Sequence, residues 1–587
     1  MASTETAASK ESFESDSSNG DLFAVVGSFK AQLASVCALA FLMRMMHVMN
    51  TFEVPTVVTL LGDARGYFEW GERIAAGNWY GDQTFYQAPL YPYFLALLFK
   101  VFGSSITAVR IVQSLLGVAS VALLGIAGRR MFTPRVGVVA AIMLAVYPPA
   151  IYYDGIIQKA SLAAFLLCGL LAACATLRDR PRVWLAVLTG ATLGLLVITR
   201  ENALLWVPIV PFWIAVAFSP ETLQKRLVLA ASCVGGLALI LLPVAARNAS
   251  LGGEWSPTTF QAGPNFYIGN NALATGIYQP LVAGHETPMF ERADAQRLAE
   301  QALGKTLSAR EVSKFWMARS FDEIKQNPVR WVQLLFAKTL MVVNRYEVPD
   351  VESMYVFREY SLPLKVARLW HFGILFPVAI WGLIVTRANW RELWLYHLLT
   401  ATMIAAVAGF FILGRYRLPV AVLAIPFAAV GLIDLFTRVR AKRSRPITIA
   451  IGAVLLVAVG CNFRVHDEAS LNASSYMNLG VSAGRSGNLR ESIEWLEKAI
   501  TAFPESAESN FNLGRAWSIS KQPAKAIPCY QRALLVKPNL VGADRFLAMD
   551  LERIGQPQAA LVHYRRAIEI DPNDEASRAG IARISGQ

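Results

Sequence analysis

The feature that most constrains this chain is a series of apolar segments, each close to the length needed to cross a bilayer. A helix needs about 20 apolar residues to span roughly 30 Å of hydrocarbon. The segments lie at 30–49, 105–127, 135–152, 158–177, 183–199, 203–218, 226–244, 366–386, 393–413, 418–437 and 447–462. With 55% hydrophobic residues, the chain is too apolar for a soluble protein of 587 residues. The sequence therefore predicts an all-α, polytopic transmembrane helical bundle with about 11 spans.

The orientation of these spans follows from short basic loops, because cytoplasmic loops carry an excess of lysine and arginine. Two further apolar stretches, 89–102 and 331–343, are shorter than a typical span. If both lie at the membrane surface, all five basic loops fall on one side. If both cross, the first three fall outside. The basic residues are Arg129, Arg130, Arg135, Arg178, Arg180, Arg182, Lys225, Arg226, Arg387, Arg391, Arg438, Arg440, Lys442, Arg443 and Arg445. We therefore expect a cytoplasmic N-terminus and a C-terminus outside.

This topology places most of the polar chain on the outer face. The outer segments are two large loops (50–104 and 245–365), short turns at 153–159, 200–202 and 414–417, and the part after 462. The first 29 residues are polar and lack the basic region and cleavage site of a signal peptide. We expect them to form a disordered tail, followed by a first span that is retained. The net charge of +13 reflects the basic loops and does not indicate nucleic-acid binding.

The C-terminal part repeats with a period of 34 residues: 474–507, 508–541 and 542–575, after a linker at 463–473. Small residues, alanines and prolines recur in register at 479–480, 513–514 and 547–548, at Ala499, Ala533 and Ala567, and at Pro504, Pro538 and Pro572. This pattern resembles the tetratricopeptide repeat, in which paired helices pack closely and a proline ends the second helix. The segment 474–587 is therefore predicted to form an α-solenoid that docks a protein partner, with no catalytic cluster of its own.

A carboxylate in the first outer loop is the main candidate for chemistry. Asp63 lies in the motif GDARGYFE at 62–69, and QAPLYPY follows at 87–93. An acid at this position suits a general base that takes a proton from a hydroxyl acceptor beside a lipid-borne donor. The alternative is a solvated loop acid that forms a salt bridge with Arg65 or Arg73.

The order of these motifs resembles the C superfamily of glycosyltransferases. The resemblance is greatest to family 39 and the RgtA/B/C/D-like group, which includes protein mannosyltransferases and the aminoarabinose transferase of lipid A. It covers most of residues 30–440. Further pieces are GRRMF at 128–132, Arg200-Glu201, Arg247-Asn248, NFYIGNN at 265–271 and RYRLP at 415–419. The last four of these all fall on the outer face of the topology derived from the basic loops.

The resemblance implies an enzyme that transfers a sugar from a polyprenyl-phosphate carrier to a lipid, glycan or protein acceptor. It makes Asp63 the essential acid of the first outer loop and Tyr67 the aromatic residue of the same motif. It is also compatible with a bacterial inner (cytoplasmic) membrane, with the repeats on the periplasmic or extracytoplasmic side. Most enzymes of this group work without a metal, so the resemblance implies no cofactor. A divalent cation at Asp63 is chemically compatible with a carboxylate, but the residue spacing does not support a site.

A sugar phosphate held at a membrane surface calls for basic side chains at helix ends, where they also stabilise the departing phosphate. Such residues are Lys159, Arg200, Arg247, Arg415 and Arg417. For Arg415 and Arg417 the alternative role is to extend toward lipid headgroups. For Lys159 a structural role is an equal alternative.

Other polar residues of the outer face complete the predicted substrate-binding set. They are Arg65 beside the acid, Asp154 after the third span, Glu201 beside Arg200, and Asn270 in the second large loop. Glu201 alternatively only neutralises Arg200. Glu347 is a weaker candidate in the same loop.

Two other classes of function compete with a transferase. A lipid or glycan transporter, or a flippase, would place charges near the middle of its spans, whereas here the few charges lie nearer span ends. A membrane-anchored scaffold for the repeats would need only one or two helices. The chain lacks G-x-x-x-x-G-K-[ST] and H-E-x-x-H, and its six histidines are scattered, so nucleotide-driven and zinc chemistries find no support.

Overall fold

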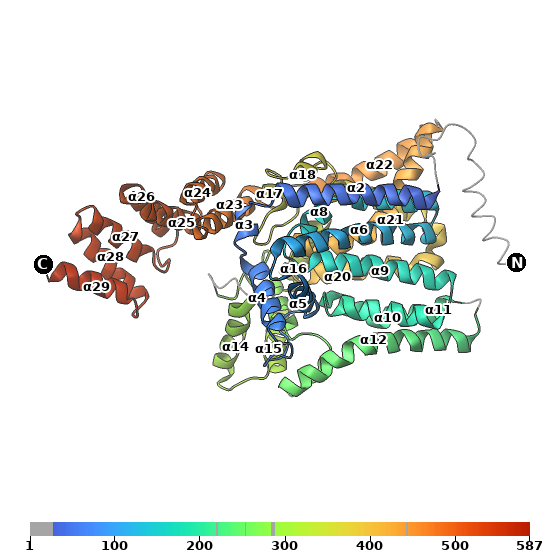
Figure 1. Ribbon diagram of the computed structural model, residues 1–587, viewed down its shortest axis with the longest axis horizontal. Helices are drawn as coiled ribbons and strands as arrows, with labels where there is room; N and C mark the ends of the chain where they lie inside the picture. The colour runs from blue at the N-terminus through green and yellow to red at the C-terminus, as the bar shows by residue number, and fades with distance from the viewer. Residues whose placement is uncertain (1–27, 219–220, 253, 283–287, 442–443, 587) are drawn as a thin grey trace.

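The computed structural model describes residues 28–586 except 219–220, 253, 283–287 and 442–443. The predicted tail at 1–29 lies almost entirely outside the described residues. In the described part the structure is helical, and its isolated β-bridge joins Ile277 to Ile412. Figure 1 shows long helices running side by side, with the beginning of α2 at one end of the bundle and the C-terminal repeats beyond the other.

Each of the eleven apolar segments coincides with a helix or a pair of helices. These are α2 (Phe29–Asn50), α6 (Ile106–Met131), α7 (Pro134–Ala145) with α8 (Pro148–Asp154), α9 (Ala160–Asp179), α10 (Val183–Val197), η1 (Glu201–Leu205) with α11 (Trp206–Ala217), α12 (Leu223–Gly252), α19 (Phe372–Val385), α20 (Trp390–Gly409), α21 (Gly414–Arg440) and α22 (Ser444–Asn462). The short turn η2 (Arg387–Asn389) precedes α20. The predicted polytopic helical fold is confirmed.

Among the described residues, six helices are long and apolar enough to cross a membrane, or seven if α7 and α8 form one bent span. The two are bent by 58°, because Pro148 lacks the N–H group that would continue α7. The remaining four apolar segments form shorter apolar helices of 10–17 residues, with α22 counted from Ile447 to Asn462. The crossing of the membrane by all eleven segments stays a prediction.

Close packing within the bundle depends on glycines. A Cβ atom added at Gly382 of α19 would lie 1.8 Å from the Phe427 carbonyl oxygen of α21, and one added at Gly190 of α10 would lie 1.8 Å from the Cys233 carbonyl of α12. Such small residues let membrane helices approach backbone to backbone. They bring α19 against α21 and α10 against α12.

The two large loops fold into shorter helices at the end of the bundle that faces the repeats (Figure 1). The first loop forms α3 (Pro55–Val58), α4 (Gly62–Ala75) and α5 (Leu90–Phe102). The second forms α13 (Ala262–Asn270), α14 (Pro288–Leu303), α15 (Ala309–Gln326), α16 (Pro328–Val343), α17 (Met354–Phe357) and α18 (Leu362–Val366). The two short apolar stretches are thus helices α5 and α16.

The C-terminal part forms three helix pairs and one further helix. They are α23 (Glu468–Arg485) with α24 (Leu489–Ala502), α25 (Ala507–Ile519) with α26 (Pro523–Val536), α27 (Ala543–Arg553) with α28 (Pro557–Ile570), and α29 (Glu575–Ser585). The pairs match the three predicted repeats. Gly480 packs against Leu496, and Gly514 packs against Tyr530, as the repeat pattern requires. Residues 468–473, predicted as part of a linker, instead belong to α23, whose N-cap is Asp467.

Candidate functional site

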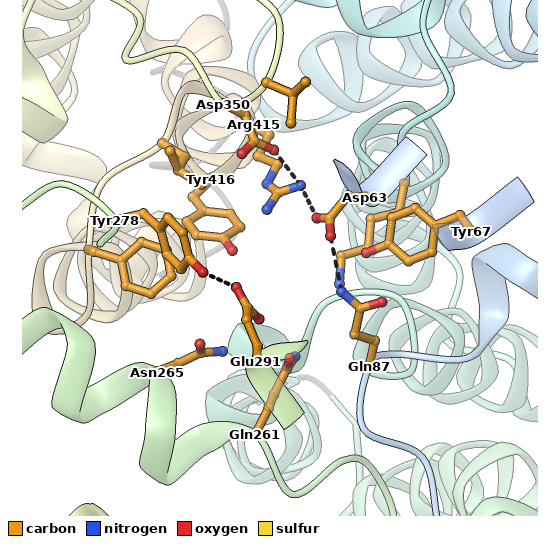
Figure 2. A pocket seen from close by; sticks show the side chains of 14 residues that line it. Asp63, Tyr67, Gln87, Gln261, Asn265, Tyr278, Glu291, Asp350, Arg415 and Tyr416 are labelled. Carbon is orange, nitrogen blue, oxygen red and sulfur yellow. Dashed lines mark hydrogen bonds and ion pairs between the residues drawn. The ribbon is translucent and has the colours of Figure 1, made fainter. Parts of the chain in front are cut away.

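Asp63 lines a pocket at the end of the bundle where the loop helices gather (Figure 2). It lies in the first turn of α4, directly after Gly62, whose φ of +51° favours glycine. Its carboxylate forms a close ion pair with Arg415 and accepts a hydrogen bond of 3.3 Å from Gln87 Nε2. Tyr67, one helical turn further along α4, is buried and lines the same pocket. The first outer loop therefore supplies the acid, the amide and one aromatic ring.

Arg415 stands between two carboxylates. Its Nη1 contacts Asp63 and also lies 2.8 Å from Asp350 Oδ2. Arg415 belongs to the first turn of α21, and its carbonyl oxygen accepts a hydrogen bond of 2.6 Å from Arg200 Nη2. The Tyr416 ring packs against the guanidinium groups of both arginines, with centroid distances of 4.9 and 5.2 Å. Residues far apart in the sequence are thus held around one cation.

A second cation, Lys159, lines the same pocket from the N-terminal end of α9. Its Nζ lies 3.9 Å from Glu201, which also accepts hydrogen bonds of 2.8 Å from Gln261 Nε2 and 3.1 Å from Thr259 Oγ1. Glu201 therefore links Lys159 to the second large loop and is not limited to neutralising Arg200.

The opposite side of the pocket carries polar but mostly uncharged groups from the second large loop. Figure 2 shows Gln261, Asn265, Tyr278 and Glu291 together on this side. The Tyr278 hydroxyl donates a hydrogen bond to Glu291, and its ring packs at 5.3 Å against Phe411. The pocket thus has a cationic side and an amide-rich side.

The carboxyl groups of the pocket titrate differently. Burial acts to raise the pKa of Asp63, but the charge and hydrogen bond of Arg415, with Lys159 and Gln87, outweigh it and lower that pKa. Burial raises the pKa of Asp350; the charge of Arg415 opposes the rise, and the like charge of Asp63 adds to it. Burial also raises the pKa of Glu291 to about 7, and the charge of Asp63 adds to the effect. Asp63 is therefore ionised at neutral pH, while Glu291 is near its midpoint.

Three predicted substrate-binding residues lie outside the residues that line this pocket and have other partners. Arg65 forms an exposed ion pair with Glu69 at 2.6 Å. Asp154 is buried in the bundle, 2.7 Å from Arg44. Arg247 donates to the Tyr80 carbonyl, and its guanidinium packs at 3.7 Å on the Phe85 ring.

Two further residues of the predicted set, Asn270 and Arg417, are also engaged elsewhere. Asn270 accepts hydrogen bonds from Lys338 Nζ and Trp331 Nε1, each at 3.0 Å. Arg417 is buried against Glu347 at 2.8 Å. Neither Arg415 nor Arg417 reaches toward lipid headgroups, because both are buried and ion-paired.

The structure adds four polar pocket residues that the sequence did not single out: Gln261, Tyr278, Glu291 and Asp350. Asp350 follows Glu347, a weaker candidate in the same loop, by only three positions. No spacing signal marked Tyr278 or Glu291. In the part of the chain that the structure describes, no three His, Cys, Asp or Glu side chains are grouped so as to hold a metal ion.

Comparison with known proteins bears on both halves of the chain. Residues 86–245 match the family described as dolichyl-phosphate-mannose-protein mannosyltransferase. Residues 473–506 and 507–540 each match the tetratricopeptide repeat. None of the curated proteins compared matches the chain.

Several solved structures are similar to it. One is the apo oligosaccharyltransferase of Archaeoglobus fulgidus, with 15% identity, a TM-score of 0.43, and coverage of 80% of this chain and 58% of that one. The chain thus matches little more than half the length of that enzyme. Another is ArnT from Cupriavidus metallidurans bound to undecaprenyl phosphate, with 16% identity, a TM-score of 0.38 and coverage of 86% and 80%. A third is MamA, with 23% identity, a TM-score of 0.20 and coverage of 25% and 81%.

Within the helical membrane part, residues 86–245 are therefore similar to the dolichyl-phosphate-mannose-protein mannosyltransferase family. This chain joins that membrane part to a C-terminal tetratricopeptide repeat domain.

Proposed function

We propose that the protein transfers a sugar from a polyprenyl-phosphate donor to a hydroxyl group of a lipid, glycan or protein acceptor. The observation that supports this most is the convergence of Asp63, Lys159 and Arg415 in one pocket. Asp63 and Arg415 are 352 positions apart in the chain, yet their side chains form an ion pair. An acid beside two cations is the set that a general base and a phosphate site require.

The cationic side suits a phosphate group. Arg415 lies in the first turn of α21 and Lys159 is the N-cap residue of α9. The N-terminal end of a helix carries a partial positive charge, so both cations lie where an anion is further stabilised. Without substrate, Asp63, Asp350 and Glu201 neutralise them. A lipid-linked phosphate would compete for the same donors.

When a phosphate competes with Asp63 for Arg415, the Asp63 carboxylate becomes available to act as the base. The acceptor hydroxyl oxygen attacks the anomeric carbon while the bond from that carbon to the phosphate oxygen breaks. Asp63 accepts the hydroxyl proton, and the polyprenyl phosphate leaves with its charge stabilised by Arg415 and Lys159. Because Arg415 lowers the pKa of Asp63, a shift of Arg415 toward the phosphate makes Asp63 a stronger base. A single displacement inverts the configuration at the anomeric carbon.

The amide-rich side suits the sugar. Gln261, Asn265 and Glu291 offer amide and carboxylate groups, which hydrogen-bond hydroxyl groups as donors and acceptors. Figure 2 shows this group across the pocket from Arg415 and Asp63. A sugar bound there would have its phosphate on the cationic side and its anomeric carbon between the two.

We place the pocket and the repeats on the extracytoplasmic face of the inner membrane, with the N-terminus in the cytoplasm. Figure 1 shows the start of α2 at the end of the bundle opposite the repeats. The basic loops support a cytoplasmic location for that opposite end. The repeats that project from the pocket side would bind a protein partner or acceptor there.

Asp63→Asn provides the test, measured as turnover of a labelled polyprenyl-phosphate sugar by purified protein. Loss of the base is expected to lower kcat by about 10² to 10⁴-fold. The matched control is Glu69→Gln on the same helix, which removes only the exposed pair with Arg65 and should leave turnover unchanged. Wild-type turnover in a folded Asp63→Asn protein would overturn the proposal.

A further inference from the structure

The first repeat differs from the other two in its packing. Leu479 of α23 and Trp495 of α24 belong to the same buried hydrophobic cluster as the membrane helices. The second and third repeats share a separate core around Tyr530, Leu547 and Tyr564. The first repeat is therefore a continuation of the membrane part, while the later repeats project from it (Figure 1).

One face of α23 contacts the loop segment that leads into α4. Ser482 Oγ lies within hydrogen-bonding distance of two carbonyl oxygens, 2.6 Å from that of Pro55 and 3.0 Å from that of Thr59. One turn further along α23, Ser486 Oγ lies 2.7 Å from Thr59 Oγ1. Asp63 follows Thr59 by four positions, so α23 fixes the chain immediately before the proposed base.

The same face of α23 also contacts the segment that carries Asp350. Asn478 Nδ2 donates a hydrogen bond of 2.8 Å to the carbonyl oxygen of Val351. Asn478, Ser482 and Ser486 are spaced by four residues, which places them along one side of the helix. A single helical stripe thus reaches both loops that supply carboxylates to Arg415.

The two loops also contact each other at the residues next to these carboxylates. A Cβ atom added at Gly62 would lie 2.5 Å from Val351 Cγ2, so only glycine lets these segments approach so closely. Gly62 precedes Asp63, and Val351 follows Asp350. The backbone N–H of Gly414, which precedes Arg415, donates at 2.8 Å to the Val348 carbonyl. A continuous series of contacts therefore links α23 to the Asp63–Arg415–Asp350 cluster.

We propose that α23 of the first repeat positions the catalytic pocket, with Asn478 and Ser482 as positioning residues that hold the Asp63 and Asp350 loops around Arg415. This inference rests on the proposed function. Loss of either contact would leave Lys159 and Arg200 in place, because neither belongs to the two loops that α23 holds. The donor would still bind, but the base would be misplaced.

The experiment compares Asn478→Ala with Asn512→Ala. Asn512 is the equivalent residue of the second repeat, 34 positions later, where its side chain donates only to the Glu508 carbonyl of its own helix. For Asn478→Ala we expect kcat to fall by about tenfold to 10²-fold, with little change in the donor KM, since small misplacements of reacting groups have effects of this size. Asn512→Ala should match the wild type in both constants.

Hydrogen–deuterium exchange provides a readout that does not require turnover. In Asn478→Ala, the segments 54–69 and 344–353 should exchange faster, whereas Asn512→Ala should leave them unchanged. Ser482→Ala should behave like Asn478→Ala, and Ser486→Ala, at an exposed position, should have the same effect in weaker form. If Asn478→Ala matches Asn512→Ala in kcat and in exchange, the positioning role is wrong. If the wild type has no transfer activity, the proposed function fails, and exchange alone still decides whether α23 holds the two loops.

Discussion

Arg415 and Arg417 are two positions apart in α21 and both pair with carboxylates, but their surroundings differ sharply. The side chain of Arg417 is 1% exposed and that of its partner Glu347 is 7% exposed. Arg417 Nη1 also donates to the carbonyl oxygens of Tyr346, at 2.6 Å, and Met341, at 3.1 Å. Around Arg415, by contrast, the carboxylates of Asp63 and Asp350 are 14% and 30% exposed.

The difference follows from helix geometry. Residues two positions apart point to different sides of a helix, so one arginine faces the pocket and the other faces packed backbone. A sealed pair cannot exchange its partner without burying an unpaired charge, which is costly. A pair that borders a pocket can exchange a carboxylate for another anion. Arg415 can therefore bind an anion in the pocket, whereas Arg417 supports the packing of α21.

The largest effect on transfer in this comparison is expected for Arg415→Gln. In the proposed reaction Arg415 stabilises the departing phosphate, so its removal should lower kcat by about 10² to 10³-fold. The released carboxylates border the pocket and can be hydrated, so the protein should still fold. Turnover of the labelled donor measures the effect, with the exposed Arg65→Gln as control. Near-normal turnover in Arg415→Gln would assign Arg415 to structure and remove the distinction between the two arginines.

Arg417→Gln should have the opposite profile. It leaves Glu347 buried without its cation, and breaking such a pair destabilises a protein by about 3–5 kcal/mol. We expect a clear fall in Tm in detergent, with activity per folded molecule close to that of the wild type. The double variant Arg417→Gln/Glu347→Gln should recover part of the stability because no unpaired charge remains. A folded Arg417→Gln protein of normal Tm that had lost transfer would contradict this assignment.

The sequence predicted the helices well because the length of an apolar segment reports directly on a membrane helix. The 34-residue repeat was equally informative, since each repeat folds through contacts close in sequence. The boundary at 463–473 was predicted less well: α23 begins at Glu468, because its first turns pack against the loop before α17, where Tyr346 and Ser353 both contact Asn472.

The site was predicted only in part. Asp63 was a candidate as the acid of the first outer loop. Lys159 and Arg415 were candidates as basic residues at helix ends on the same predicted face. The same reasoning selected Asp154 and Arg417, but hydropathy does not show whether a side chain faces a pocket or a neighbouring helix. Glu291 and Tyr278 were not predicted, because they lie in a large loop whose sequence has no periodic pattern and whose fold is set by tertiary contacts.

The smallest expected effect concerns Glu291, on the amide-rich side of the pocket opposite Arg415. Its pKa of about 7 means that the fraction of carboxylate rises as the pH increases from 6 to 8. A carboxylate accepts hydrogen bonds from sugar hydroxyls more strongly than the neutral acid, so the donor KM of the wild type should fall over this range. Glu291→Gln should raise the KM by about tenfold or less, because glutamine keeps a neutral hydrogen bond that is weaker than the charged one by about 1 kcal/mol, and it should remove the pH dependence of the KM. The kcat should change little, because Glu291 is assigned to binding and Asp63 to proton transfer.

A pH-dependent KM that persisted in Glu291→Gln would place the titrating group elsewhere, with Asp350 as the next candidate because its pKa is also raised by burial.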